Sequence, residues 1–137
     1  MIFESEKRIY DKSVGKYLSA EWVLDTDKQT VIHTYESGNV NKRKFIKDCT
    51  RYHLNYRVDN NPGSLQKLVN EGKIISYLEE LEIKVTDAVN EQVEIWKNES
   101  EEFRIAHEIG NIYDEGRLGN MFQAMARDII YKAMIYV

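Results

Sequence analysis

The sequence contains little cysteine and little proline, and it has no long hydrophobic run. Its single cysteine, Cys49, excludes an internal disulfide and fits a reducing compartment. A single proline in 137 residues is compatible with long helices. No apolar run approaches the roughly 20 residues that a membrane-spanning helix needs, and the first residues lack the apolar segment of a signal peptide. We therefore expect a cytoplasmic protein that does not associate with a membrane.

The composition is typical of a globular protein, with 42% hydrophobic and 31% charged residues. A chain of 137 residues fits one domain and can bury a core without disulfides or metals. We expect a single domain that spans residues 1–137. Within it we expect an N-terminal arm at 1–18, a β-hairpin at 19–36 and a helical bundle at 39–137.

The expected hairpin has the pattern of two strands joined by a turn. Residues 22–24 and 30–35 are rich in β-branched and aromatic side chains, and residues 25–28 between them are polar. An isolated hairpin is only marginally stable in water, so we expect its apolar side to pack on helices.

The clearest helical pattern lies in the centre of the chain, at residues 64–97. Apolar residues recur there mostly three or four positions apart, which places them on one side of an α-helix. We expect one long amphipathic helix, or two helices joined near Gly72. Residues 59–63 contain the only proline and mark the break before this region.

Shorter helices are expected on either side of the central stretch. Upstream, Asn39 or Asn41 can cap a helix that runs to about Tyr56. Downstream, Ser100 is followed by two glutamates and begins a helix that runs to about Tyr113, because the N-terminal end of a helix favours both a serine cap and acidic residues.

The last expected helix, at about 117–136, follows a turn at 114–116. It is apolar on more than one side, which is typical of a helix in the middle of a bundle or at a contact between subunits. The predicted fold class is therefore mostly α (α+β), a bundle of four to five helices with a small N-terminal β-hairpin.

The net charge of −4 is unevenly distributed. Residues 41–57 contain six basic residues and one acidic residue, whereas residues 74–102 contain nine acidic residues and two lysines. A basic segment attracts phosphate and an acidic segment repels it, so the two segments predict different partners.

The residues that commonly carry chemistry form no recognisable catalytic or metal site. No two of the three histidines (His33, His53, His107) lie three or four residues apart. His107-Glu108 resembles the start of the zinc-protease motif His-Glu-x-x-His, but Asn111 stands where the motif has its second histidine. Cys49 falls on an apolar stripe, which favours a buried residue over a nucleophile. No glycine-rich phosphate loop is present. We expect no enzymatic activity, no cofactor and no metal.

An aromatic and basic pattern at residues 51–57 has two interpretations. Tyr52 and Tyr56 lie beside Arg51 and Arg57, and such residues can stack on bases or bind phosphates. The same pattern is equally typical of half a core stripe with solvated arginines.

Four segments, in order along the chain, resemble one known family. Residues 42–48 are similar to a stretch in which a basic residue is followed by Tyr-Leu-Lys-Glu. Residues 68–81 are similar to a segment that contains two leucines, then Gly-Lys-Leu, then a further leucine and an acidic-hydrophobic pair. Residues 100–104 resemble Thr-Glu-x-Leu-Lys, and residues 119–136 follow the pattern Met-Asn-x-Ile, Ala-Glu-Glu-Ile-Val, Ile-Tyr. These are the motifs of the TnpV family, small transposon-encoded proteins of bacterial mobile elements.

The sequence departs from this family pattern in three places. Extra residues lie around 55–64 and around 110–116, and residues 104–107 stand where the family has Lys-Ala-x-Asp. The resemblance implies a mobile-element setting, and it supplies no catalytic residues to carry over.

The charge split, the small size and the implied setting lead to one functional expectation. We expect a non-enzymatic accessory protein that binds a host protein and inhibits a nucleic-acid-handling defence system, in the manner of an anti-CRISPR protein acting on a Cas effector nuclease. An acidic helical face would dock in the basic channel of such a nuclease. The residues expected on this face are Glu79, Glu80, Glu82, Asp87, Glu91, Glu94, Glu101 and Glu102.

Two alternatives remain open. The first is a DNA-binding accessory protein of a transposon that uses a basic helix at 41–57. Its expected nucleic-acid contacts are Lys42, Arg43, Lys44, Lys47, Arg51 and Arg57. The second is a self-associating structural protein that forms a homodimer through its C-terminal helix.

Overall fold

The computed structural model describes residues 1–10 and 18–137, and in these residues it contains six strands and five helices. The chain divides into two units, unit 1 at Met1–Glu82 and unit 2 at Ile83–Val137. Helix α3 (Ile74–Glu99) begins in unit 1 and ends in unit 2. The mixed α+β class is confirmed, and the expectation of a single domain stays a prediction.

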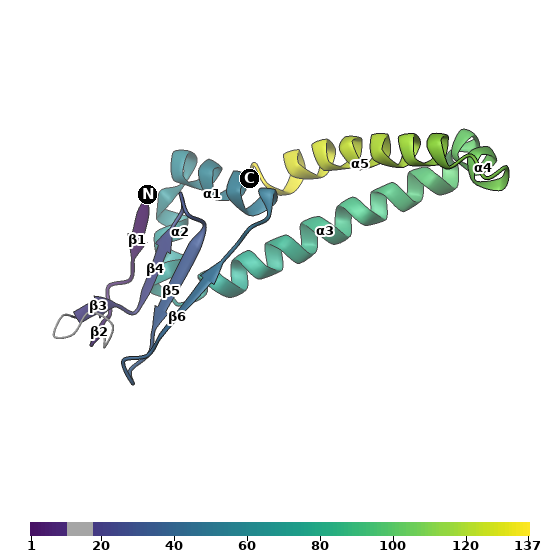
Figure 1. Cartoon of the computed structure of the whole chain (residues 1–137). Helices are drawn as coiled ribbons and strands as arrows, with labels where there is room; N and C mark the ends of the chain where they lie inside the picture. The colour runs from purple at the N-terminus through teal and green to yellow at the C-terminus, as the bar shows by residue number, and fades with distance from the viewer. Residues whose placement is uncertain (11–17) are drawn as a thin grey trace. The chain divides into compact units, whose positions relative to one another are not determined.

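Unit 1 contains a four-stranded antiparallel sheet where only a hairpin was expected (Figure 1). The expected hairpin is confirmed as its two central strands, which pair from Trp22↔His33 to Asp25↔Thr30. In strand order, the sheet consists of β1 (Ile2–Glu4), β4 (Trp22–Asp25), β5 (Thr30–Thr34) and β6 (Val40–Lys44). A separate two-stranded sheet pairs β2 (Arg8–Tyr10) with β3 (Leu18–Ala20).

The predictions for the flanks of the hairpin were wrong. The expected N-terminal arm instead contributes β1 and β2 (its residues 11–17 lie outside the described residues), and the expected helix at 39–56 begins only at Asp48. Strand β6 replaces its first turns, because every residue from Val40 to Lys44 pairs with a residue of β5. Gly38 provides the positive φ of 85° in the turn between the strands. Pairing with the preceding strand has outweighed a local helical pattern.

The core of unit 1 lies between the sheet and three helices. Alternate strand residues point to one face of the sheet, where Leu24, Val31 and Phe45 are almost completely buried. Helices α1 (Asp48–Asn60), α2 (Pro62–Asn70) and the first part of α3 cover this face. Their buried members of the same cluster are Leu54, Leu65, Val69, Ile74 and Leu78.

The long central pattern forms two helices joined near Gly72, as one of the two expectations had it. Gly72 has a φ of 69°, a left-handed conformation that favours glycine at the end of a helix. The indole of Trp22 packs directly against this glycine, and it also stacks on His33 with the ring centroids 3.8 Å apart. Asn61 stands before α2 as its cap residue.

Unit 2 is a helical hairpin, in which α5 (Ile112–Met134) runs back alongside the second part of α3 (Figure 1). The short helix α4 (Glu101–Glu108) lies between them, and Ser100 caps it as predicted by accepting the backbone N–H of Phe103 at 3.1 Å. The ring of Phe122 on α5 contacts Trp96 on α3 and Phe103 on α4, with centroids 6.1 and 6.3 Å apart.

The turn expected at 114–116 was placed too late. The chain turns at Gly110, which has a φ of 70°, and Asn111 caps α5 by accepting the backbone N–H of Asp114 at 3.1 Å. Asp114 and Glu115 belong to the first turn of α5, where the helix dipole favours negative charge. In the described part of the chain, no helix is long and apolar enough to cross a membrane.

Candidate interaction surfaces

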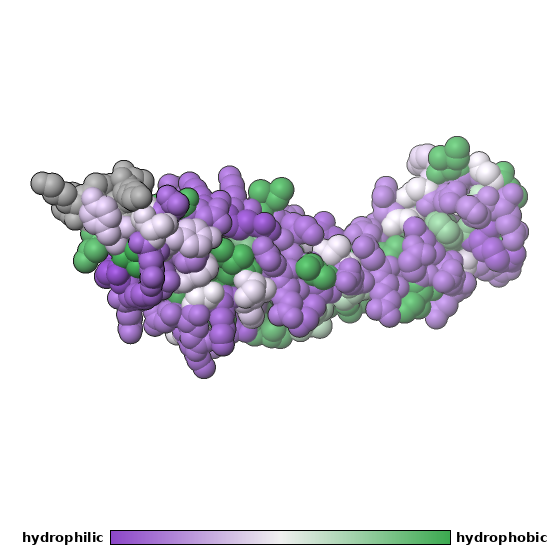
Figure 2. Space-filling model, turned by 90° about the horizontal axis from the view of Figure 1, so that it is seen from below, coloured by the Kyte–Doolittle hydropathy of each residue, from purple (hydrophilic) through white to green (hydrophobic). Residues whose placement is uncertain are grey.

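The negative charge of the protein belongs to unit 2. Unit 2 contains ten acidic and six basic residues, whereas unit 1 contains thirteen of each. The net charge of −4 therefore comes entirely from the helical hairpin. The face of this unit that Figure 2 shows is mostly hydrophilic, with hydrophobic residues in small separate patches.

Three of the predicted acidic residues form one exposed row on α3, which we name the acidic stripe: Asp87, Glu91 and Glu94. They are four and three residues apart, so they lie on the same side of the helix, and all three are exposed. Among the described residues, Asp87 and Glu91 have no ion-pair partner. Glu94 lies 3.8 Å from Lys97. This stripe is the only part of the expected acidic face whose charge is largely uncompensated.

The other five predicted acidic residues do not belong to this row, and most of them have a partner of their own. In unit 1, Glu79 pairs with Arg43 at 3.6 Å, and Glu82 accepts a 2.6 Å hydrogen bond from the buried Thr50 hydroxyl. Glu80 is exposed on the unit 1 part of α3.

In unit 2, the last two predicted acidic residues are paired with arginines. Glu101 lies 3.6 Å from Arg104, and Glu102 lies 2.9 Å from Arg117. The sequence could not reveal the partner of Glu102, since Arg117 belongs to a different helix.

The predicted basic residues do not lie on one helix, because the segment 41–57 is divided between β6 and α1. Arg43 points toward the core face, where it lies over the Phe45 ring at 4.9 Å. On α1, Arg51 pairs with Asp48 at 3.3 Å and lies over the Tyr52 ring at 5.0 Å. These contacts favour the structural interpretation of the aromatic and basic pattern.

The remaining predicted basic residues have different surroundings. Arg57 donates a 2.9 Å hydrogen bond to the Ser64 hydroxyl, and Lys47 precedes α1 as its cap residue. Lys42 and Lys44 are two residues apart on β6, so both lie on the face of the sheet opposite the core.

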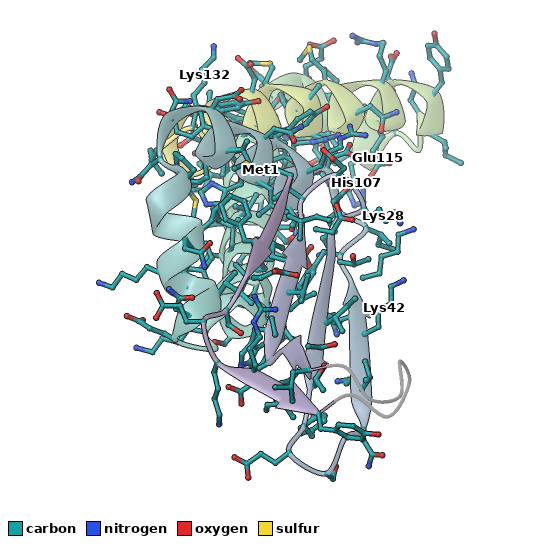
Figure 3. The ribbon with its side chains drawn as sticks, turned by 90° about the vertical axis from the view of Figure 1, so that its left-hand side faces the viewer. Met1, Lys28, Lys42, His107, Glu115 and Lys132 are labelled. Carbon is teal, nitrogen blue, oxygen red and sulfur yellow. The ribbon has the colours of Figure 1, made fainter. Side chains whose placement is uncertain are left out.

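A third lysine, which the sequence interpretation missed, lies beside Lys42 and Lys44. Lys28 is in the turn between β4 and β5, and the register places Thr30, two residues later, opposite Lys44. Figure 3 shows Lys28 and Lys42 extending from the same border of the sheet. Among the described residues, none of the three has an ion-pair partner. We name Lys28, Lys42 and Lys44 the lysine edge.

The surroundings of His53, His107 and Cys49 are those of residues that support the fold. His53 is buried and shares a 2.7 Å hydrogen bond with the Tyr77 hydroxyl, and His107 lies 2.8 Å from Glu115 on the surface of unit 2 (Figure 3). Burial, reinforced by the negative charge of Glu82, raises the pKa of the Cys49 thiol. A thiol of raised pKa is a poor nucleophile at neutral pH. The described residues contain no group of three His, Cys, Asp or Glu side chains that could hold a metal ion.

Unit 2 also has an open hollow of about 450 Å³ beside Phe103. Gly116 and Gly119 of α5 form part of its wall, together with Lys97 and Glu115. The hollow combines apolar and charged groups without a buried polar cluster, so its lining does not point to a particular ligand.

Comparison of the chain with models of protein families, with curated proteins and with solved structures finds no match. The resemblance to the TnpV family stays a prediction.

Proposed function

We propose that the protein is a non-enzymatic accessory protein of a bacterial mobile element, similar to the TnpV family, that inhibits a nucleic-acid-handling defence nuclease by binding it. The most concrete form of the proposal is an anti-CRISPR protein acting on a Cas effector. The acidic stripe of Asp87, Glu91 and Glu94 is the observation on which the proposal depends.

The physical basis is charge complementarity. RNA-guided nucleases hold their guide and target strands in a positively charged channel. A helix with an exposed row of carboxylates can compete for such a channel, since complementary fields speed association and favour the correct partner. Two of the three stripe residues have no ion-pair partner within 4 Å among the described residues, so docking of these two would not require internal ion pairs to break first.

The test uses variants that change the same net charge at different places. Asp87→Asn, Glu91→Gln and Glu94→Gln together neutralise the stripe. A control with Glu101→Gln, Glu108→Gln and Asp128→Asn removes three exposed carboxylates of unit 2 that already lie within 4 Å of a basic side chain. The measurements are the Kd for purified RNA-guided nucleases of the host and the rate of target cleavage.

We expect wild-type protein to slow cleavage by one of these nucleases when added before the target DNA, and to bind less once DNA occupies the channel. Neutralising the stripe should weaken binding about tenfold or more, which corresponds to roughly 1.4 kcal/mol for three charged contacts. The control should bind like wild type. Equal losses in both variants, or no inhibition of any nuclease tested, would contradict the proposal.

A second candidate, self-association, is favoured by an apolar row on α5. Met121, Met125 and Ile129 are spaced by four residues and are 42%, 46% and 50% exposed. Light scattering should give the mass of a dimer for wild-type protein and of a monomer for Met125→Glu. Ile105→Glu, at a similarly exposed apolar residue of α4, is the control that should leave the dimer intact.

A further inference from the structure

The lysine edge is unusual in this protein because its charges are not compensated. Most of the described cationic side chains contact a carboxylate, an aromatic ring or a hydroxyl group. The described lysines with no such partner are Lys28, Lys42, Lys44 and Lys67. Three of these four gather at one border of the sheet of unit 1, and Lys67 lies apart on α2.

The register of β6 gives this border a second set of hydrogen-bond donors. The backbone N–H of Phe45 donates to the carbonyl of Gln29, and that of Tyr35 donates to the carbonyl of Asn39. In an antiparallel pair every second residue bonds to the neighbouring strand, so the odd-numbered residues from 39 to 45 face β5 and the even-numbered residues face away from it. The backbone N–H groups of Lys42 and Lys44 therefore point away from β5, toward the side of β6 on which no described strand pairs with it. All five residues of β6 are exposed.

The two aspartates of the turn that contains Lys28, and Glu79 beside β6, have contacts of their own. Asp25 accepts the backbone N–H groups of Asp27 and Lys28 at 3.1 and 3.2 Å in the turn. Asp27 pairs with the N-terminal amine at 2.9 Å, and Glu79 faces Arg43. Among the described residues, no carboxylate lies within 4 Å of the ammonium groups of the lysine edge, so this border carries three unpaired positive charges although unit 1 as a whole has no net charge.

We propose that the lysine edge binds the phosphate backbone of duplex DNA without reading its sequence. Lysine side chains and backbone N–H groups are both frequent donors to phosphate oxygens. The residues opposite the two strand lysines are Thr30 and Ile32, so the described neighbours of these lysines on β5 offer no aromatic ring for stacking on bases. The contact is consequently electrostatic, and it belongs to a different surface from the acidic stripe.

Two other roles of the same lysines predict different results. Lysines on an edge strand also protect a sheet against pairing with other strands, and an acidic peptide strand added to β6 would be attracted by Lys42 and Lys44. Both roles concern β6 itself. Lys28 lies outside this strand. If Lys28 contributes to binding, the ligand is a polyanion that also contacts the turn before β5, and not only a strand added to β6.

The experiment is fluorescence anisotropy of a labelled 20-base-pair duplex with the full chain, between 20 and 200 mM salt. Three phosphate contacts give a slope of about −2.7 for log K against log salt, which is about 40-fold weaker binding at 200 mM than at 50 mM. Lys28→Gln, Lys42→Gln and Lys44→Gln should each reduce the slope by about 1, and the triple variant should abolish binding. Lys67→Gln is the matched control and should bind like wild type.

The proposal fails if wild-type protein does not bind at 20 mM salt, or if Lys67→Gln weakens binding as much as the other variants. It also fails if Lys28→Gln has no effect, which would indicate strand addition at β6. Poly-glutamate of matched charge is a further arm. Tighter binding of this polymer than of DNA would assign the lysine edge to an acidic protein, whereas preference for DNA supports the proposal.

Discussion

Replacing Gly72 by alanine tests the joint between α2 and α3. Gly72 has a φ of 69°, which costs a residue with a side chain about 1–2 kcal/mol. A Cβ atom there would also lie 2.8 Å from Nε1 of Trp22 and 3.1 Å from its Cε2. The indole cannot easily move away, because it is stacked on His33 with an interplanar angle of 7°.

The expected loss of stability has two parts that can be measured separately. The backbone part alone is given by Gly110→Ala, because Gly110 has a φ of 70° and no atom within 4 Å of the new Cβ. Forcing a methyl group against a packed ring adds about 1–3 kcal/mol. We therefore expect Gly72→Ala to lower the free energy of unfolding of unit 1 by about 2–5 kcal/mol, and Gly110→Ala to lower that of unit 2 by about 1–2 kcal/mol.

The assay is urea unfolding, and the two tryptophans report on the two units. Trp22 lies in unit 1 and Trp96 in unit 2, so fluorescence in a Trp96→Phe background follows unit 1, and in a Trp22→Phe background it follows unit 2. A double-mutant cycle with Trp22→Phe, followed by circular dichroism, removes the indole from the contact. The extra penalty of Gly72→Ala should then disappear.

Two results would refute this reasoning. Equal losses for Gly72→Ala and Gly110→Ala would mean that Trp22 does not constrain the joint. If Gly72→Ala lowers the free energy of unfolding by the same amount after Trp22→Phe, the loss is due to the backbone conformation alone.

Two further predictions concern a helix cap and the buried thiol. Ser100→Ala should destabilise unit 2 by about 1 kcal/mol, because the backbone N–H of Phe103 loses its acceptor. Urea unfolding followed by Trp96 fluorescence measures this loss, and an unchanged unfolding midpoint would contradict the prediction. The Cys49 thiol, whose pKa is raised by burial, ionises more readily in the unfolded chain. Stability should therefore fall as the pH rises above about 9, and this slope should be shallower in Cys49→Ala.

The sequence by itself determined the features that depend on neighbouring residues. The break around Pro62 and the cap at Ser100 were predicted, because a missing N–H and a side-chain acceptor act within one helical turn. The two central strands were also predicted, since a polar turn and β-branched arms lie within a few residues of each other.

Only the tertiary structure decided which segments join the sheet and which charges are compensated. Residues 40–44 were expected to be helical, but they pair with β5 because an adjacent strand supplies hydrogen bonds and a face on which Phe45 is buried. The free charges were equally hidden in the sequence. Arg43 pairs with Glu79 and Arg117 with Glu102 across the fold, whereas Asp87 and Glu91 of the acidic stripe and the three residues of the lysine edge have no ion-pair partner among the described residues. An ion pair depends on distance in space, and the order of residues along the chain does not give that distance.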